Sequence, residues 1–420
     1  MRFHRAVAAV VVLAVAAVVV VVVVVPGGDE PPGPAPTPEP TPVPTPALDA
    51  VGRGPSLAVG ITEPNPSLVA APLTRSVPRE FERWRDPLAA IHPAVYRLVV
   101  PWSSVQPRPA AAPNLALLNG GCMRAIPPCA PFAGLRDQLR ALASRQKQGP
   151  GWAGMLVITG MPPWAARDVP GCRRGAPLTA AGPRPVALRA YRSLLRYVLS
   201  VAHTEGASIR YVSPWNEPNH PIFLAPQRAA CDPASPTLAA APYAALARTA
   251  QSELGPGQEL VLGETAGILA PTVRATSVPE FIRALPRSLV CSARVWSQHG
   301  YIGGADPVRA VSAALDARRC SRRAAIWITE TGVGPAPGGL SLARGITSER
   351  KGCALLHRQL VRWYENPRVT LAVQYTFRED NLFPTGLVTA DLTRARPALR
   401  EWQAWGSRRP DARPPRSTCQ

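Results

Sequence analysis

The chain has 420 residues, of which 46% are hydrophobic, so its composition allows a sizeable core in one large domain or two modest ones. Its formal net charge is +20 at pH 7, but nearly all basic residues are arginines, scattered along a chain that is also rich in alanine and proline. This pattern indicates a compositional bias more than a nucleic-acid-binding surface. We therefore expect no nucleic-acid partner; attraction to anionic glycans or to a membrane surface is more consistent with such a charge.

The first segment, residues 1–25, favours a membrane anchor. Arg2 and Arg5 precede an unbroken apolar run over residues 6–25, which is long enough to span a bilayer. A cleaved signal peptide is the alternative, although its apolar core is usually shorter and ends at a small-residue cleavage site. With the basic flank inside, we predict an extracytoplasmic, membrane-anchored protein, or a secreted one if the segment is cleaved.

Residues 26–50 form a predicted linker, because proline alternates with other residues over 37–46 and excludes both helix and sheet interior. Such a segment is an extended, semi-rigid spacer. Residues 51–410 form the predicted catalytic domain, and residues 411–420 a C-terminal tail.

Within the predicted domain, short apolar strands alternate with longer amphipathic helices, which is typical of a parallel α/β architecture. Eight such units predict a closed (β/α)8 TIM barrel, with a doubly wound open sheet as the alternative. The expected strands lie at residues 57–61, 96–101, 155–159, 210–214, 259–263, 294–299, 325–329 and 370–375. The clearest expected helices lie at residues 132–145, 186–203, 243–254, 307–318, 350–364 and 397–405.

Eight cysteines without a CxxC motif favour disulfides, and hence an oxidising compartment, over a metal site. Free buried thiols are the alternative. Pairing between neighbours predicts these bonds: Cys122–Cys129, Cys172–Cys231, Cys291–Cys320 and Cys353–Cys419.

Two glutamates stand at the ends of predicted strands: Glu217 in a Trp-Asn-Glu-Pro-Asn stretch at 215–219, and Glu330 in an Ile-Thr-Glu-Thr-Gly stretch at 328–332. In a parallel barrel, the carboxyl ends of all strands meet on one face, so the two carboxyls can converge there. Two facing carboxyls are what glycoside hydrolysis requires. We therefore predict Glu217 and Glu330 as catalytic residues of a glycosidase.

Other side chains at strand ends are predicted to contact the substrate. Asn216 can donate to a sugar hydroxyl, His299 can bind another, and Tyr301 can hydrogen-bond a nucleophilic carboxylate. Arg97 lies inside an apolar strand, so it requires a carboxylate partner, whose pKa it would lower; a purely structural ion pair is the alternative. Trp102 is a candidate for stacking on a sugar ring.

Further strand-end residues are rivals for these roles. Trp164 and Trp215, like Trp102, lie near the ends of predicted strands. Each of them either stacks on a sugar ring or fills the core. Glu63 and Glu264 also follow strands, and we expect them to position substrate or to be structural.

The two glutamate motifs together resemble those of the clan A retaining glycoside hydrolases. The Arg97, Trp102, Gln106-Pro107 run and the His299-Gly300-Tyr301 run are most similar to family thirty-nine, with family five second. The resemblance covers about residues 57–405. It implies a (β/α)8 barrel, retention of configuration, Glu217 as acid/base, Glu330 as nucleophile, and neither metal nor organic cofactor. One departure is that related enzymes often carry a tryptophan at the end of strand eight, where Phe377 is the expected replacement.

The predicted function is thus an extracytoplasmic, monomeric glycosidase that acts on an oligo- or polysaccharide by double displacement. The alternative is a non-catalytic glycan-binding protein of the cell envelope on the same barrel.

Overall fold

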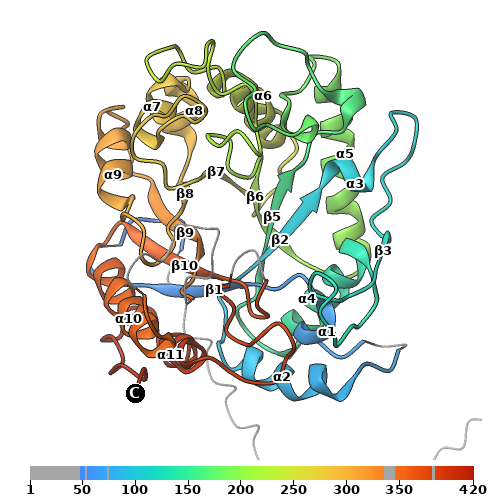
Figure 1. The fold of residues 1–420 in the computed structure, drawn as a ribbon, viewed down its shortest axis with the longest axis vertical. Coiled ribbons are helices and arrows are strands. Elements are labelled where there is room, and N and C mark those ends of the chain that lie inside the picture. The colour runs from blue at the N-terminus through green and yellow to red at the C-terminus, as the bar shows by residue number, and fades with distance from the viewer. Residues whose placement is uncertain (1–47, 53, 73–74, 335–345, 381–383) are drawn as a thin grey trace, which may run out of the picture. The chain divides into compact units, whose positions relative to one another are not determined.

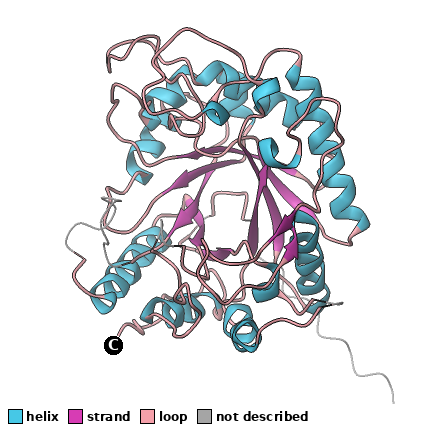
Figure 2. Cartoon of the chain, turned by 45° about the vertical axis from the view of Figure 1, so that its right-hand side comes forward, coloured by secondary structure: helices cyan, strands magenta, loops and turns pink. Residues whose placement is uncertain are grey.

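The computed structural model describes residues 48–52, 54–72, 75–334, 346–380 and 384–420 (Figure 1). In this part of the chain, eight parallel strands close into a barrel in the order β1-β10-β9-β8-β7-β6-β5-β2. Helices surround the sheet (Figure 2). The predicted (β/α)8 barrel is confirmed, and the open-sheet alternative is excluded. The barrel strands are β1 (Ala58–Thr62), β2 (Val95–Pro101), β5 (Ala153–Thr159), β6 (Ile209–Ser213), β7 (Glu259–Thr265), β8 (Val295–His299), β9 (Ala325–Thr331) and β10 (Val369–Tyr375).

The helices follow the strands in the alternation that the sequence predicts. They are α1 (Pro66–Val69), α2 (Arg79–Ala89), α3 (Trp102–Val105), α4 (Gly134–Gln148), α5 (Ala187–Thr204), α6 (Ala240–Gln251), α7 (Val278–Ala284), α8 (Arg287–Ser292), α9 (Val308–Asp316), α10 (Glu349–Glu365) and α11 (Pro397–Gly406). Two 3-10 turns, η1 (Pro163–Ala165) and η2 (Leu178–Ala180), lie between β5 and α5. A small antiparallel pair, β3 (Leu118–Asn119) and β4 (Phe132–Ala133), lies between α3 and α4.

Helix α5 shows how the apolar pattern produces the outer layer. Tyr191, Leu195 and Val198 recur at the spacing of one helical face, and all three are buried. The hydroxyl of Tyr191 donates to the carbonyl of Pro214 at 2.8 Å. The helix is therefore fixed to the turn that leads from β6 to Glu217.

The barrel interior is apolar where the strands begin and polar where they end. Successive side chains on a strand point to opposite faces, so positions two apart share the interior. Val95 belongs to the interior apolar cluster, and Arg97 follows it two positions later on β2. On β8, Val295 is followed in the same way by Ser297 and His299. The strands thus carry ionisable side chains to one end of the barrel.

The other end of the barrel is occupied by residues that we assigned to the linker. The carbonyl of Leu48 accepts from the Trp327 indole at 2.9 Å and from the Thr370 hydroxyl at 2.5 Å. The buried carboxylate of Asp49 lies 3.0 Å from Arg294. The described chain is therefore packed against the barrel from Leu48 on.

The predicted membrane anchor and residues 26–47 of the predicted linker lie outside the described residues. Among the helices that the structure describes, none has both the length and the apolar composition needed to cross a bilayer.

The four predicted disulfides are confirmed. They are Cys122–Cys129, Cys172–Cys231, Cys291–Cys320 and Cys353–Cys419, with Cα–Cα distances between 4.2 and 5.4 Å. No cysteine among the described residues is free. Disulfides persist in oxidising compartments, so these bonds indicate an extracytoplasmic protein.

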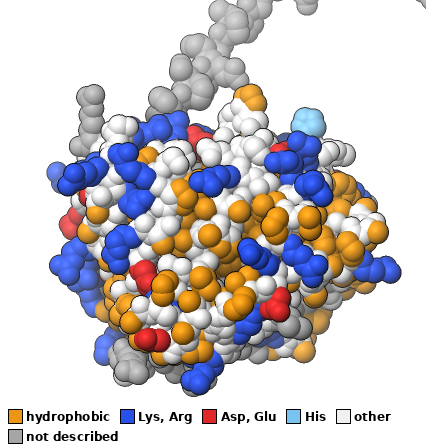
Figure 3. All heavy atoms as spheres, turned by 90° about the horizontal axis from the view of Figure 1, so that it is seen from above, with side chains coloured by type: hydrophobic (Ala, Val, Ile, Leu, Met, Phe, Trp, Pro, Cys, Tyr) orange, Lys and Arg blue, Asp and Glu red, His pale blue; other side chains and the backbone are white. Residues whose placement is uncertain are grey.

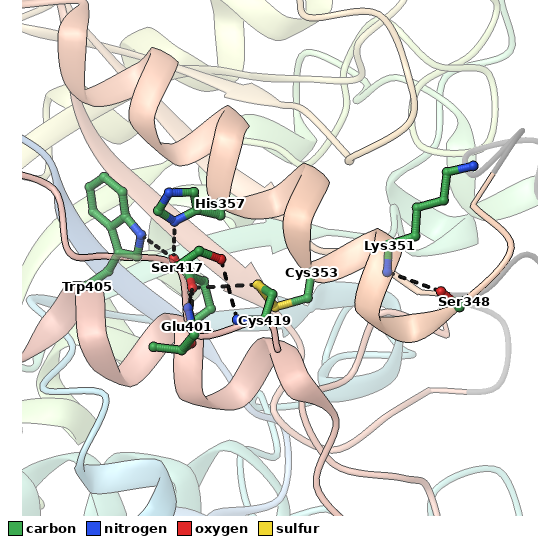
Figure 4. The surroundings of a disulfide bond; sticks show 9 residues. Ser348, Lys351, Cys353, His357, Glu401, Trp405, Ser417 and Cys419 are labelled. Atoms are coloured by element: carbon green, nitrogen blue, oxygen red, sulfur yellow. Dashed lines mark hydrogen bonds and ion pairs between the residues drawn. A yellow bond between two sulfur atoms is a disulfide. The ribbon is translucent and has the colours of Figure 1, made fainter.

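The C-terminal tail is fixed to the barrel around one buried carboxylate (Figure 4). Glu401 on α11 accepts from the Trp405 indole at 2.8 Å and lies 2.7 Å from the His357 ring. Its second oxygen accepts the backbone N–H of Thr418 at 2.9 Å, next to the disulfide that joins Cys419 to α10. The tail is thus held by one covalent bond and by hydrogen bonds to a buried charge.

Candidate active site

The predicted catalytic glutamates come together at the carboxyl end of the barrel. Glu217 follows β6, and Glu330 lies near the end of β9. One carboxylate oxygen of each, together with a ring nitrogen of His299, forms a group whose members all lie within 4.8 Å of one another. His299 Nδ1 is 2.8 Å from Glu217 and 3.4 Å from Glu330. The side chains of Glu217 and Glu330 are 16% and 10% exposed, so both reach solvent.

The turn that presents Glu217 is held by its neighbours. Glu217 and Glu264 have φ angles of 39° and 50°, in the left-handed region that non-glycine residues seldom occupy. The N–H of Glu217 donates to the carbonyl of Glu264 at 2.8 Å, and the N–H of Asn216 donates to Ile158 at 2.9 Å. Backbone strain of this kind persists only where the surroundings impose it, as at functional sites.

Two predicted partners contact Glu330, one through a hydrogen bond and one through an ion pair. The hydroxyl of Tyr301 donates to one carboxylate oxygen at 2.7 Å. Arg97 Nη2 lies 2.8 Å from the other oxygen. The interaction that we predicted for Arg97 thus involves Glu330, and it also involves a second carboxylate.

That second carboxylate belongs to Glu264, which is fully buried. Arg97 Nη2 donates to Glu264 at 2.7 Å and Nε donates to the same oxygen at 3.2 Å. Glu264 also lies 3.1 Å from His299 Nε2. Since its side chain is 0% exposed, Glu264 cannot reach a substrate without rearrangement. Glu264 thus holds Arg97 and His299 in place. We expected it either to position substrate or to be structural, and its contacts here are structural.

Arg97 also settles the orientation of Asn216. A guanidinium can only donate, and Arg97 Nη2 lies 2.8 Å from Asn216 Oδ1. The amide oxygen must therefore face Arg97. The amide nitrogen, which is the donor end, points away from it.

Burial alone would oppose the charges of this cluster, but the ion pairs outweigh it. Burial acts to raise the pKa of Glu264, yet Arg97 and His299 hold it at about 2. Burial acts to lower the pKa of His299, yet Glu330, Glu217 and Glu264 raise it to about 10. The carboxylates of Glu264 and Glu330 likewise raise the pKa of Arg97 against its burial. At neutral pH, Glu264 is therefore ionised and His299 is an imidazolium.

The spacing of this cluster would also suit a metal. The ligand atoms of Glu217, His299 and Glu330 are close enough to share an ion. An ion bound there would take the place of the proton between His299 and Glu217, because it requires the lone pair of a ring nitrogen. The other group of suitable spacing, Cys353, Glu401 and Cys419, has its two sulfurs in a disulfide.

Two of the predicted aromatic contacts are wrong. Trp102 is fully buried, donates to Gln106 at 2.9 Å and packs edge-on against Tyr191, so it offers no face to a sugar. Phe377 is also fully buried and packs against Trp84, so it does not replace the tryptophan that related enzymes carry. Both serve the core, which is the commoner use of large aromatic side chains.

The other tryptophans divide in the same way. Trp215 is fully buried and donates to the carbonyl of Phe223, whereas Trp164 is partly exposed and packs edge-on against Trp102. A further aromatic side chain, which was not among the predicted site residues, is Tyr375, which ends β10 and remains partly exposed. Burial and the nearby carboxylate of Glu330 raise its pKa above the usual range. Its position at the end of a strand was the available signal.

Glu63 is structural in this arrangement. It is buried after β1, where its two oxygens accept the backbone N–H groups of Asn65 and Arg378, each at 2.8 Å. Burial raises its pKa to about 7 despite these hydrogen bonds.

Comparison with known proteins supports the fold. No family model and no curated protein matches the chain. Solved structures that do match include a glucosidase from Croceicoccus marinus, with TM-score 0.51, 13% identity, and coverage of 86% of this chain and 69% of that one. The GH53 catalytic domain of Ignisphaera aggregans matches with TM-score 0.51 and 14% identity, over 86% of this chain and 98% of that one. A GH30 endoxylanase from Clostridium papyrosolvens C71 matches with TM-score 0.50 and 9% identity, over 86% and 75%. The chain thus has the barrel fold that the glycoside hydrolases of clan A share.

Proposed function

We propose that the protein is an extracytoplasmic glycoside hydrolase that cleaves O-glycosidic bonds with retention of configuration. The observation that carries this proposal is the approach of the Glu217 and Glu330 carboxylates to within 4.8 Å at the carboxyl end of the barrel. Retaining enzymes hold their two carboxyls about 5–5.5 Å apart, whereas inverting enzymes need about 6.5–9.5 Å to admit a water.

The surroundings of the two carboxyls suggest their roles. Glu330 is contacted by the Arg97 guanidinium at 2.8 Å and by the Tyr301 hydroxyl at 2.7 Å, an arrangement that suits a nucleophilic carboxylate. Glu217 instead lies 2.8 Å from His299 Nδ1. We therefore assign Glu330 as nucleophile and Glu217 as acid/base.

The reaction then has two steps. Glu330 attacks the anomeric carbon while Glu217 gives its proton to the departing glycosidic oxygen, which leaves a glycosyl ester on Glu330. Glu217, now a carboxylate, takes a proton from water as the water oxygen attacks the same carbon and releases Glu330. In this scheme Asn216 donates its outward amide N–H to a sugar hydroxyl, Tyr375 borders the sugar, and His299 orients Glu217.

The test separates the two roles by the choice of leaving group. On a polysaccharide, Glu217→Gln and Glu330→Gln should each abolish turnover. On an aryl glycoside that leaves without a proton, Glu217→Gln should still form the glycosyl-enzyme and show a burst, whereas Glu330→Gln should not. Glu80→Gln, at an exposed position on α2, is the matched control and should behave like the unaltered protein.

Two outcomes would decide against the proposal. Wild-type rates in either active-site variant would show that the substituted glutamate does not have the catalytic role assigned to it. Glycan binding without any labelling of Glu330 by a mechanism-based fluoroglycoside would favour the non-catalytic alternative. Attachment to a membrane through residues 1–25 is a separate proposal, and partitioning of the full-length protein between membrane and soluble fractions tests it.

A further inference from the structure

Three loops at the carboxyl end of the barrel form one continuous edge, which we call the β5–β7 rim. It comprises residues 160–186, 219–237 and 266–277, which follow β5, β6 and the end of β7. The disulfide Cys172–Cys231 joins the first two loops. Asn219 joins the second and third, because its amide donates to the carbonyls of Ala266 and Thr276 at 3.0 and 3.1 Å. The rim is thus held in one arrangement.

One arginine of the rim, Arg228, has a structural role inside the protein. Arg228 is fully buried, forms an ion pair with Glu280 of α7, and donates to the carbonyl of Ser235 at 2.7 Å. Its charge is therefore satisfied inside the protein. The remaining arginines of the rim are on the outside.

These outer arginines exceed the acidic side chains around them. The three loops contain six arginines and two aspartates, Asp168 and Asp232. Arg167, Arg174 and Arg274 are exposed, and none of them has an ion-pair partner among the described residues. Figure 3 looks onto the part of the molecule at the top of Figure 1, and basic side chains there are widespread while acidic ones are few.

On the opposite side of the carboxyl end of the barrel, several arginines form ion pairs with carboxylates. Arg124 lies 2.6 Å from Asp380, and Arg394 lies 2.7 Å from Glu349. Arg396 pairs with Glu379 as well as with Glu349. Compositional bias supplies arginine to both sides, but these arginines of the opposite side are paired with carboxylates, whereas Arg167, Arg174 and Arg274 of the β5–β7 rim have no such partner in the described part of the chain.

The rim also reaches the proposed catalytic residue. His220 follows Glu217 by one turn, and its N–H donates to the carbonyl of Glu217 at 2.9 Å. Arg274 lies against the backbone of Gly175, where an added Cβ would be 2.7 Å from Nη1. His220 lies within electrostatic range of both Glu217 and Arg274. Its Nδ1 accepts the N–H of Ile222 at 3.3 Å, so the ring proton of the neutral form is on Nε2.

We propose that the β5–β7 rim binds carboxylate or sulfate groups of a polyanionic glycan, with Arg174 and Arg274 as the principal contacts. The inference rests on the proposed function in one respect, since it identifies the substrate class as an acidic polysaccharide. Guanidinium groups bind carboxylate and sulfate oxygens through paired, charge-assisted hydrogen bonds. A chain of negative groups would engage several of the rim arginines while one glycosidic bond lies at Glu217.

The experiment measures binding without turnover, in full-length protein carrying Glu330→Gln. The probes are an oligogalacturonate, a heparin hexasaccharide and the neutral xylohexaose, each at about 50 and 200 mM salt. We expect the anionic probes to bind at least about tenfold more tightly than xylohexaose at low salt, with the advantage shrinking at high salt. Comparison of the two anionic probes shows whether carboxylate or sulfate is preferred.

In the test variant and in the control, each substitution replaces an exposed arginine by glutamate, so the change in net charge per substitution is the same. Arg174→Glu with Arg274→Glu should weaken anionic binding roughly tenfold or more, and leave xylohexaose binding unchanged. The control is Arg248→Glu, an exposed position in the last turn of α6, where we expect less than about a twofold change.

Three outcomes would overturn the inference: equal binding of neutral and anionic probes, an equal effect of the control, or anionic lipid vesicles bound with the same dependence on Arg174 and Arg274. Failure of the proposed function is distinguishable from these. An unaltered protein that hydrolyses nothing but keeps the anionic preference would refute the hydrolase and retain the rim. A protein that hydrolyses neutral glycans with no anionic preference would retain the hydrolase and refute the anion-binding role of the rim.

Discussion

Replacing Arg97 by methionine should destabilise the barrel, because it removes the shared cation of two carboxylates. Arg97 Nη2 lies 2.7 Å from Glu264 and 2.8 Å from Glu330, and Arg97 and Glu264 are 0% exposed. Removing one partner of a buried ion pair costs about 3–5 kcal/mol. The unfolding entropy of a barrel of this size is roughly 0.8 kcal/mol per kelvin, so the midpoint of thermal unfolding should fall by about 4–6 °C at pH 7.

Circular dichroism melts at pH 7 and pH 4 test this reasoning. The pKa of Glu264 is held at about 2 by Arg97 and His299. Without Arg97 the folded-state pKa rises, so acid neutralises a buried carboxylate and the loss should be smaller at pH 4. Adding Glu264→Gln should recover part of the loss, and Arg97→Lys, which keeps the charge, should lose less. A midpoint within about 1 °C of the unaltered protein at pH 7, or an equal loss at both pH values, would refute the reasoning.

Other expectations follow from the same contacts. Tyr301→Phe removes the hydrogen bond to Glu330 and should lower kcat/KM by roughly 10–100-fold, because hydrogen bonds to charged groups contribute about 1.5–3 kcal/mol; a loss below threefold would contradict its role. Burial acts to lower the pKa of His299, but the three carboxylates raise it to about 10 from an ordinary 6.5. Its stabilising contribution is therefore full below pH 6.5 and is lost as the pH rises through 10, and His299→Asn should flatten that decline in melts across the range. Removing the Cys353–Cys419 bond by paired alanines should cost about 4 kcal/mol, because it closes a loop with a sequence separation of 66, and denaturant midpoints like those of the unaltered protein would contradict this.

The parts of this structure that sequence predicts best are those with a repeating pattern. The apolar strands and amphipathic helices carry their own periodicity, so the barrel and its strand order follow from local signals and the rules of parallel connection. The disulfides were predictable for a related reason. Each joins cysteines that are neighbours among the cysteines of the chain, so pairing in order along the sequence was enough to predict all four bonds.

The aromatic residues at strand ends show what a repeating pattern does not predict, namely the direction in which a side chain points. Trp102 and Phe377 both follow barrel strands, which is also where substrate-binding residues stand. Whether such a side chain turns toward the barrel axis or back into the helix layer depends on the local course of the loop. In α3 the chain turns at once into a helix, and Trp102 packs against Tyr191 of α5.

Glu264 illustrates a second limit, because its type and position do not distinguish it from Glu217 or Glu330. All three are glutamates at strand ends, yet only Glu264 is fully enclosed. The difference comes from the side chains that surround each one. Arg97 and His299 come from β2 and β8, far apart in sequence, and they meet at Glu264 only because the barrel closes.

The third glutamate matters to the proposed chemistry because it positions the two groups that hold the other glutamates. Glu264 accepts a hydrogen bond from Arg97 at 2.7 Å and lies 3.1 Å from His299 Nε2. Arg97 in turn lies 2.8 Å from Glu330, and His299 Nδ1 lies 2.8 Å from Glu217. A neutral residue in place of Glu264 would weaken both anchors, because hydrogen bonds to a charged group are stronger than those to a neutral one, although it touches neither the sugar nor the water. Glu264→Gln should therefore slow both steps, and pre-steady-state rates of glycosylation and deglycosylation that are both unchanged would contradict the argument.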